Sequence, residues 1–240
     1  MVKNTTIKRP HHAYVRDVYL AYLIDGARRT EGQGFPIIEK WMVTDKPPKS
    51  IIQWDRRCDV VDPKTTGMSF YCNDPGFTPI LNNPKLYVNK LRDYEVIIGL
   101  DASPYDNMPP WVQNSQIGLN LGITYYFGSR GLKVIPNVRL GSKETINSLA
   151  AYPHNTLIAI GTNGFIQKKQ NCKIFAEQMK LIIDTLEPTG ICVYGYLTEE
   201  IFAYANEKNI PLFQYDSFTM KRNAKAKKHK SSEVISDEGW

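Results

Sequence analysis

The sequence predicts an α/β fold built on a mainly parallel sheet, and three observations indicate it. Seven short apolar runs with strand-like composition occur along the chain, at 51–55, 68–74, 96–101, 134–139, 157–162, 191–195 and 212–216. Their starts advance by 17 to 38 residues, a spacing suited to strands that alternate with crossover helices. The late runs are apolar throughout, which is typical of strands covered on both faces.

The elements around these runs follow from apolar spacing and from caps. Residues 11–27 carry apolar side chains at mixed helical spacing, which predicts an opening helix that ends near Gly26. The segment 35–38 is too short to assign and is either an edge strand or a packing segment. Helices are expected at 111–129, 170–186 and 198–208, the last with Thr198 as its cap.

Two architectures fit this order of elements. A closed, TIM-like barrel of about seven or eight strands would place every strand end on one rim, and 37–38 or an unrecognised segment would supply the eighth strand. The alternative is an open doubly wound sheet, which concentrates its site beside a switch point. We favour the barrel, because a polar residue ends nearly every run and no dinucleotide-binding glycine fingerprint is present.

Composition limits the class of protein. The chain has 240 residues, 42% hydrophobic and 22% charged, which is typical of a globular protein with one main domain. We expect an N-terminal helix and linker over 1–34, an α/β domain over 35–220 and a basic, disordered tail over 221–240. The longest apolar runs are far shorter than a membrane span, and no secretory signal follows the basic start. These features predict a cytoplasmic protein with no membrane partner.

The positive charge is concentrated near the C-terminus. The net charge is +6, and residues 221–230 hold six basic groups and no acid. Such a segment attracts phosphates by counterion release, although it could also serve only to keep the protein in solution. The candidate nucleic-acid contacts are Lys221, Arg222, Lys225, Lys227, Lys228 and Lys230.

Polar residues at the strand ends form the candidate site, because the carboxyl ends of parallel strands share one edge. Aspartates recur there, among them Asp74, and so many charges need a ligand or each other as partners. The candidate catalytic residues or metal ligands are Asp55, Asp101 and Asp216. The candidate ligand-binding residues are Arg57, Ser103, Tyr105, Asn137, Arg139, Thr162, Asn163 and Tyr194.

Three chemistries could use this rim. The acids could hold Mg²⁺ or Mn²⁺ while Arg57 or Arg139 clamps the phosphate of a nucleotide-like ligand, as in metal-assisted phosphoester hydrolysis. Alternatively, two acids such as Asp101 and Asp216 could cleave a glycosidic bond if they lie about 5 to 9.5 Å apart. The rim could also bind without reacting, in a factor that uses its basic tail to hold nucleic acid or a host protein. The histidines show no spacing for zinc or for a Ser-His-Asp site.

Several blocks of the chain resemble a known family. They are Phe35-Pro-Ile-Ile, Trp54-Asp-Arg, Asn82-Asn-Pro, Gly99-Leu-Asp-Ala-Ser-Pro-Tyr with Met108-Pro, Val134-Ile-Pro-Asn-Val-Arg, Ala159-Ile-Gly-Thr-Asn-Gly and Val193-Tyr-Gly. In order and spacing they resemble a family of bacterial, phage and mobile-element proteins catalogued only as a domain of unknown function. The resemblance implies a phage or plasmid context in a bacterial cell and supplies no activity.

Overall fold

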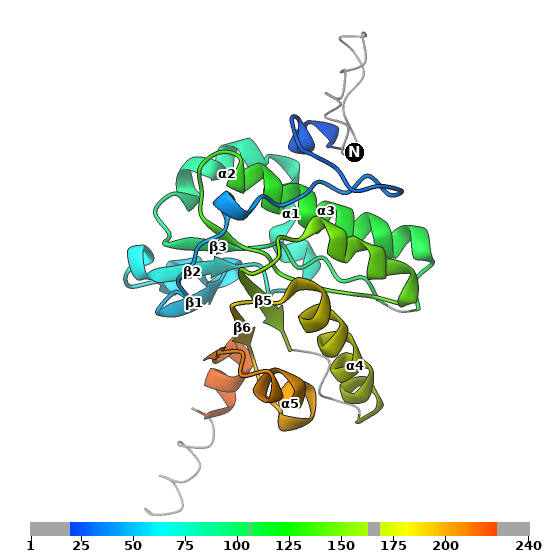
Figure 1. Ribbon diagram of the computed structural model, residues 1–240. Coiled ribbons are helices and arrows are strands. Elements are labelled where there is room, and N and C mark those ends of the chain that lie inside the picture. Colours follow the sequence, from blue (N-terminus) through cyan, green and yellow to red (C-terminus); the bar gives the residue numbers. More distant parts are fainter. Residues whose placement is uncertain (1–19, 106, 163–168, 225–240) are drawn as a thin grey trace, which may run out of the picture.

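Parallel strands in two sheets form the centre of the molecule (Figure 1). The computed structural model describes residues 20–105, 107–162 and 169–224. The first sheet has the order β1 (Ser50–Gln53), β2 (Thr66–Ser69), β3 (Val96–Ile98) and β4 (Val134–Ile135). The second has the order β5 (Leu157–Gly161), β6 (Gly190–Tyr194) and β7 (Leu212–Tyr215). Every predicted run therefore contains a strand and every pairing is parallel, but no closed barrel of hydrogen-bonded strands occurs in the described ranges.

Helices cover the sheets in partial alternation with the strands. The three predicted helices are confirmed as α3 (Pro110–Gly128), α4 (Lys169–Leu186) and α5 (Glu199–Glu207). Two helices, α1 (Thr78–Asn82) and α2 (Pro84–Leu91), were not predicted from the sequence. The start of α2 is nevertheless typical, because Pro84 lies in its first turn and the Asn83 side chain accepts a hydrogen bond from the Leu86 N–H. Residues 218–224 are also helical, and the 3₁₀ segments of the described residues are η1 (Ala21–Ile24), η2 (Lys40–Met42), η3 (Trp54–Asp59), η4 (Pro63–Thr65), η5 (Asp74–Phe77) and η6 (Lys143–Ala151).

The opening helix predicted over 11–27 is not an α-helix in its described part. Residues 11–19 lie outside the described residues, and the rest forms only the 3₁₀ turn η1. Leu20 and Gly26 on either side of η1 have φ of 54° and 78°, and such left-handed residues interrupt a helix. Leu23 is nevertheless buried in the main core, as is Ile38, so the segment 35–38 is a packing segment with a single bridge at Pro36.

Two apolar clusters hold the layers together. The larger one packs α1 to α5 and the N-terminal turns against the outer faces of the strands. The smaller one joins the two sheets, and its members are Ile51, Tyr71, Val96, Ile98, Ile135, Leu157, Ala159, Cys192 and Tyr194, with Phe213 and Tyr215 packed against them. The strands β2 to β6 are therefore buried on both faces, as continuous apolar runs predict, whereas β7 has no fully buried side chain and Gln214 in it is exposed.

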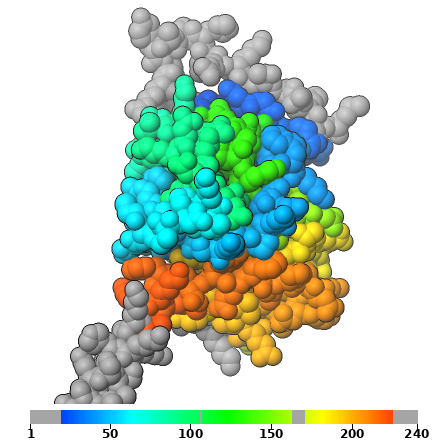
Figure 2. Space-filling view, turned by 90° about the vertical axis from the view of Figure 1, so that its left-hand side faces the viewer, coloured from blue at the N-terminus to red at the C-terminus, as the bar shows by residue number. Residues whose placement is uncertain are grey.

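The two sheets meet at two places. An isolated bridge pairs Asn137, just after β4, with Ala159 in β5. On the other side, the Tyr215 hydroxyl of β7 donates to the Pro48 carbonyl ahead of β1 at 2.7 Å. Figure 2 shows the surface around β1 and β2 resting on the C-terminal segment. Among the helices in the described residues, none is both long and apolar enough to span a bilayer.

Candidate functional site

A cavity of about 880 Å³ lies at the carboxyl ends of the strands. Its wall comes from the segments that follow β1, β2, β3 and β4, from the end of β5, from α4 and from the segment after β7. The residues that matter below are Asp55, Tyr71, Asp74, Asp101, Ser103, Tyr105, Arg139, Gly161, Ile174, Phe218 and Thr219. As expected for a parallel topology, the carboxyl ends of several strands meet around this one cavity.

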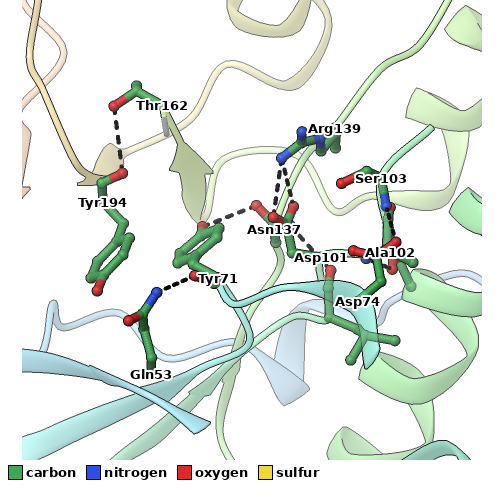
Figure 3. A network of polar contacts seen from close by, with 12 residues as sticks. Gln53, Tyr71, Asp74, Asp101, Ala102, Ser103, Asn137, Arg139, Thr162 and Tyr194 are labelled. Carbon is green, nitrogen blue, oxygen red and sulfur yellow. Dashed lines mark hydrogen bonds and ion pairs between the residues drawn. The ribbon is translucent and has the colours of Figure 1, made fainter. Parts of the chain in front are cut away.

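A buried polar network forms the floor of this cavity (Figure 3). Arg139 donates from Nη1 to both carboxylate oxygens of Asp101 at 3.0 Å. Asn137 donates from Nδ2 to Asp101 Oδ1 at 2.8 Å and to the Leu100 carbonyl at 3.1 Å. The Tyr71 hydroxyl in turn donates to Asn137 Oδ1 at 3.0 Å. Because the Asp101 carboxylate and the Leu100 carbonyl can only accept, the Asn137 amide is oriented with its NH₂ toward them and its oxygen toward the Tyr71 hydroxyl.

The Tyr71 ring is enclosed by neighbouring strands. It stacks on Tyr194 of β6 with ring centres 4.9 Å apart and planes at 11°. Gly161 of β5 faces the same ring, and a Cβ atom at this glycine would lie 2.6 Å from Tyr71 Cε1. The backbone carbonyl of Tyr71 accepts a hydrogen bond from the Gln53 side chain of β1. The ring therefore occupies space that only a glycine at position 161 leaves open.

Side chains from the helices hold the loops of the wall in place. Asn120 of α3 accepts from the Ala102 N–H at 2.8 Å and donates to the Ala102 carbonyl at 2.9 Å. Gln113, also of α3, accepts from the Ser142 N–H and donates to the Met108 carbonyl. Gln178 of α4 donates to the Gly141 carbonyl at 2.8 Å. These amide contacts fix the loops after β3 and β4, which carry Asp101 and Arg139.

Burial controls the titration of the network. It raises the pKa of Asp101, while the Arg139 charge and the hydrogen bonds from Asn137 and Arg139 act in the opposite direction. Burial also raises the pKa of Tyr71 well above its ordinary value, and the nearby Asp101 charge adds to the effect. The pKa of Cys72, another wall residue, is raised to about 11, mainly by burial. Both the phenol and the thiol therefore keep their protons at neutral pH.

The outer part of the wall is more open and carries further acids. Asp55 is exposed and Asp74 is half-buried, and Asp74 Oδ2 accepts from the Ser103 N–H at 3.5 Å. Three carboxylates, those of Asp55, Asp74 and Asp101, thus line the cavity together with the guanidinium of Arg139. In the described part of the chain, no three acidic, histidine or cysteine side chains lie close enough to hold a metal ion by themselves.

The predicted residues fall into three groups. Asp55, Asp101, Ser103, Tyr105 and Arg139 line the cavity. Asn137, Thr162 and Tyr194 are buried behind the wall, where the Thr162 hydroxyl donates to the Tyr194 carbonyl at 3.5 Å. Asp216 and Arg57 are exposed and do not belong to the wall, so Asp101 and Asp216 do not face one ligand across it. Asn163 lies outside the described residues.

Arg57 is directed to another partner. Its guanidinium lies over the Trp54 ring at 4.4 Å and donates to the Trp54 carbonyl at 3.0 Å. Sequence reasoning missed the role of Tyr71, because an aromatic residue inside an apolar run is typical of a core position. Asp74 was recognised as a strand-end acid, but nothing in the sequence marked it above the others.

The basic segment begins beside the cavity. Residues 218–224 are helical, with Lys221 and Arg222 exposed. Ser217 caps this helix by accepting from the Met220 N–H at 3.3 Å, and the Tyr194 hydroxyl accepts from the Phe218 N–H at 3.2 Å. The other predicted nucleic-acid contacts, Lys225, Lys227, Lys228 and Lys230, lie outside the described residues.

Comparison with known proteins places this architecture in a family. A family model described as a domain of unknown function (DUF4417) matches residues 31–216. The chain belongs to this family. The match spans β1 to β7 and every wall residue except Phe218 and Thr219, and it confirms the resemblance noted in the sequence.

A phage protein is also similar to this chain. The Gene 1 protein of Mycobacterium phage L5 is 22% identical over 157 residues, which are 64% of this chain and 69% of that protein. Together with the DUF4417 match, this similarity identifies a phage-associated domain of unknown function. No solved structure matches the chain.

Proposed function

We propose that the cavity binds a phosphate-bearing, nucleotide-like ligand as a complex with Mg²⁺ or Mn²⁺. One observation carries the proposal: the carboxylates of Asp55, Asp74 and Asp101 and the guanidinium of Arg139 line the same cavity of about 880 Å³. That volume lies in the range of small-molecule and cofactor sites. The position at the carboxyl ends of parallel strands is where α/β proteins bind such ligands.

The balance of charge favours a metal complex over a bare phosphate. Three carboxylates against one guanidinium would repel a free phosphate group. A divalent cation reverses this repulsion, because Mg²⁺ is held by one or two carboxylates together with the phosphates of the ligand. This mode needs no cage of three protein ligands, in agreement with the arrangement of the described acids.

The wall residues have different roles in this proposal, which follow from how accessible each side chain is. Asp55 and Asp74 lie on the open part of the wall and would contact the cation. Asp101 is occupied by Arg139 and Asn137, so its role is to hold the Arg139 guanidinium toward the cavity, where it binds a phosphate oxygen. Tyr105, Ile174 and Phe218 supply the less polar surface that a base or sugar requires.

Calorimetric titration with ATP tests this proposal. We expect binding of ATP in the presence of Mg²⁺ and little binding in EDTA. Asp74→Asn should weaken binding of the complex at least about tenfold, since it removes a charged metal ligand. Asp93→Asn is the matched control, because Asp93 is exposed in the turn before β3, at the opposite end of the sheet.

Hydrolysis is a separate readout of the same experiment. If the site also acts as a hydrolase, water adds to the phosphorus, the bond to the leaving oxygen breaks, and inorganic phosphate appears in a Mg²⁺-dependent manner.

Two outcomes of the binding titration would contradict the metal complex. One is an affinity for ATP that is the same in EDTA as in Mg²⁺, and the other is an affinity that Asp74→Asn leaves unchanged.

We infer in addition that the two sheets form one incomplete barrel that encloses the inner apolar cluster. In support of this, the strands follow the order of the sequence within each sheet, and the bridge between Asn137 and Ala159 joins the sheets. The contact of Tyr215 with Pro48 brings β7 toward β1, as does the Arg56 guanidinium 4.0 Å above the Phe218 ring. An experimental structure with β7 remote from β1 would contradict this arrangement.

A further inference from the structure

We infer that the ligand of the cavity is part of a single strand of nucleic acid, whose neighbouring nucleotides lie on the rim outside the cavity. This inference rests on the proposed function and names its substrate class. It is based on two features of the rim that are not required to bind a free nucleotide inside the cavity. One is a basic segment anchored at the wall, and the other is the set of exposed aromatic side chains on the loop and helix after β3.

The basic segment starts from a fixed point of the wall. Phe218 and Thr219 line the cavity, and Lys221 and Arg222 are exposed in the next turn of the same helix. The Arg56 guanidinium lies 4.0 Å above the Phe218 ring, which adds a third cation beside this helix. Figure 2 shows the C-terminal segment directly against the surface around β1.

The charge near this helix is mixed, but cations outnumber acids along the chain that follows. The exposed acids close to it in sequence or on η3 are Asp55, Asp59 and Asp216. Against them, residues 221–230 contain six basic groups and no acid. We expect the phosphate backbone to contact Lys221 and Arg222 on this side of the rim, while its metal-bound phosphate occupies the acidic cavity.

The aromatic residues lie on the segment after β3. Tyr105 lines the cavity and is 54% exposed, and Trp111 in the first turn of α3 is 73% exposed. Two other aromatic side chains near strand ends, those of Trp54 and Tyr194, are buried in the core. Exposed aromatic rings combined with cations are the usual means of binding single strands without sequence preference, because bases stack on the rings. Paired bases of a duplex are not available for such stacking.

Fluorescence anisotropy with labelled oligothymidylate and oligouridylate of about 20 nucleotides tests this inference. In the presence of Mg²⁺, Trp111→Ala should weaken binding about tenfold through loss of one stacked base. The double variant Lys221→Ala/Arg222→Ala should lower the slope of log affinity against log salt by about 1.4. Comparing the affinities for the two oligomers shows whether the protein distinguishes deoxyribose from ribose.

Matched controls come from the opposite end of the sheet. Trp41 is 60% exposed in η2, before β1, and Trp41→Ala should leave binding unchanged. Lys46 and Lys49 are exposed just before β1, so Lys46→Ala/Lys49→Ala removes the same charge without touching the rim. The inference is overturned if Trp111→Ala binds the oligomers as Trp41→Ala does, or if an unlabelled duplex competes as well as a single strand.

The two proposals fail in different ways. Binding of ATP with Mg²⁺ should be unaffected by Trp111→Ala, because Trp111 is not part of the cavity wall. If ATP binding depends on Asp74 but no oligomer binds more tightly than ATP, the single-strand inference is wrong and the proposed function stands. If the oligomers bind equally with Asp74→Asn or in EDTA, the proposed metal site is wrong.

Discussion

The cavity wall has two parts that differ in burial and in how their side chains are held. The inner wall consists of Tyr71, Asp101 and Arg139, and hydrogen bonds of 2.8 to 3.0 Å link these residues to one another and to Asn137 behind the wall. The outer wall consists of Asp55, Asp74 and Tyr105, for which the polar contacts described are few and long. We expect the inner wall to maintain the geometry of the site, so that disturbing it lowers stability. In the proposed function, the outer wall contacts the ligand.

Asn137→Leu provides the most severe test of the inner wall. The substitution leaves the Tyr71 hydroxyl without its acceptor and removes one donor from the buried Asp101 carboxylate. We expect the free energy of unfolding to fall by roughly 3 kcal/mol, because each buried polar group without a partner costs about 1 to 3 kcal/mol. Urea denaturation measures the change.

An asparagine of the outer region serves as the control for this variant. Asn73 also lines the cavity, but it is exposed and its side chain makes no cap contact with η5. Asn73→Ala should change the free energy of unfolding by less than about 0.5 kcal/mol. Equal effects at the two asparagines would erase the distinction between the two parts of the wall.

Gly161→Ala tests the packing of the inner wall instead of its hydrogen bonds. The added methyl group would lie 2.6 Å from the buried Tyr71 ring, so the ring must shift against Tyr194. We expect a loss of about 2 kcal/mol of unfolding free energy, as for other overpacked cores. Combining this variant with Tyr71→Leu should restore part of the loss if the ring is the cause, which a double-mutant cycle detects.

A second glycine shows what the same change does without crowding. Gly118 of α3 has space for a methyl group, whose nearest neighbour would be Phe35 Cε1 at 3.4 Å. Gly118→Ala should be neutral or stabilising by up to about 1 kcal/mol, because alanine favours the helix. A similar loss at both glycines would show that Tyr71 is not tightly enclosed.

The fold could be predicted from the sequence further than the site could. Strand positions depend on local apolar runs, so all the predicted runs contain strands and the three helices with long apolar faces were found. α1 and α2 were missed because they are short and lie between prolines and asparagines, which read as loop residues. The closed barrel that we favoured from the sequence is not found among the hydrogen-bonded strands of the described residues, because closure depends on contacts between segments as distant as Pro48 and Tyr215, which local patterns do not encode.

The site was predictable to the extent that parallel strands bring their ends together. From this rule we expected Asp55, Asp101 and Arg139 to lie at one edge, and all three line the cavity. It could not tell which strand-end residues point inward, because a shift of one residue turns a side chain to the other face. Asp216 and Arg57 therefore lie outside the wall, and nothing in the sequence marked Tyr71, which donates a hydrogen bond to the network.

The pH dependence of stability gives a smaller signal from the inner wall. Burial raises the pKa of Asp101 above its unfolded value of 3.8, so the folded protein binds this proton more tightly than the unfolded chain. The resulting stabilisation is complete below pH 3.8 and is lost as the pH rises through the raised pKa. We expect the difference in unfolding free energy between the wild type and Asp101→Asn to decrease over that window. A difference that grows with pH would contradict a raised pKa.

The smallest effect on stability is expected at the outer wall, from Tyr105→Ala. Tyr105 is 54% exposed, and its backbone N–H, which donates to the Ser103 carbonyl, is kept in the variant. The free energy of unfolding should change by less than about 0.5 kcal/mol, whereas the affinity for ATP with Mg²⁺ should fall because a base loses its apolar contact. Leu86 of α2 has the same exposed fraction and lies outside the wall, so Leu86→Ala should leave both quantities nearly unchanged. If Tyr105→Ala lowers stability as much as Gly161→Ala does, Tyr105 belongs to the supporting structure, and the ligand surface must be sought on Asp55 and Asp74 alone.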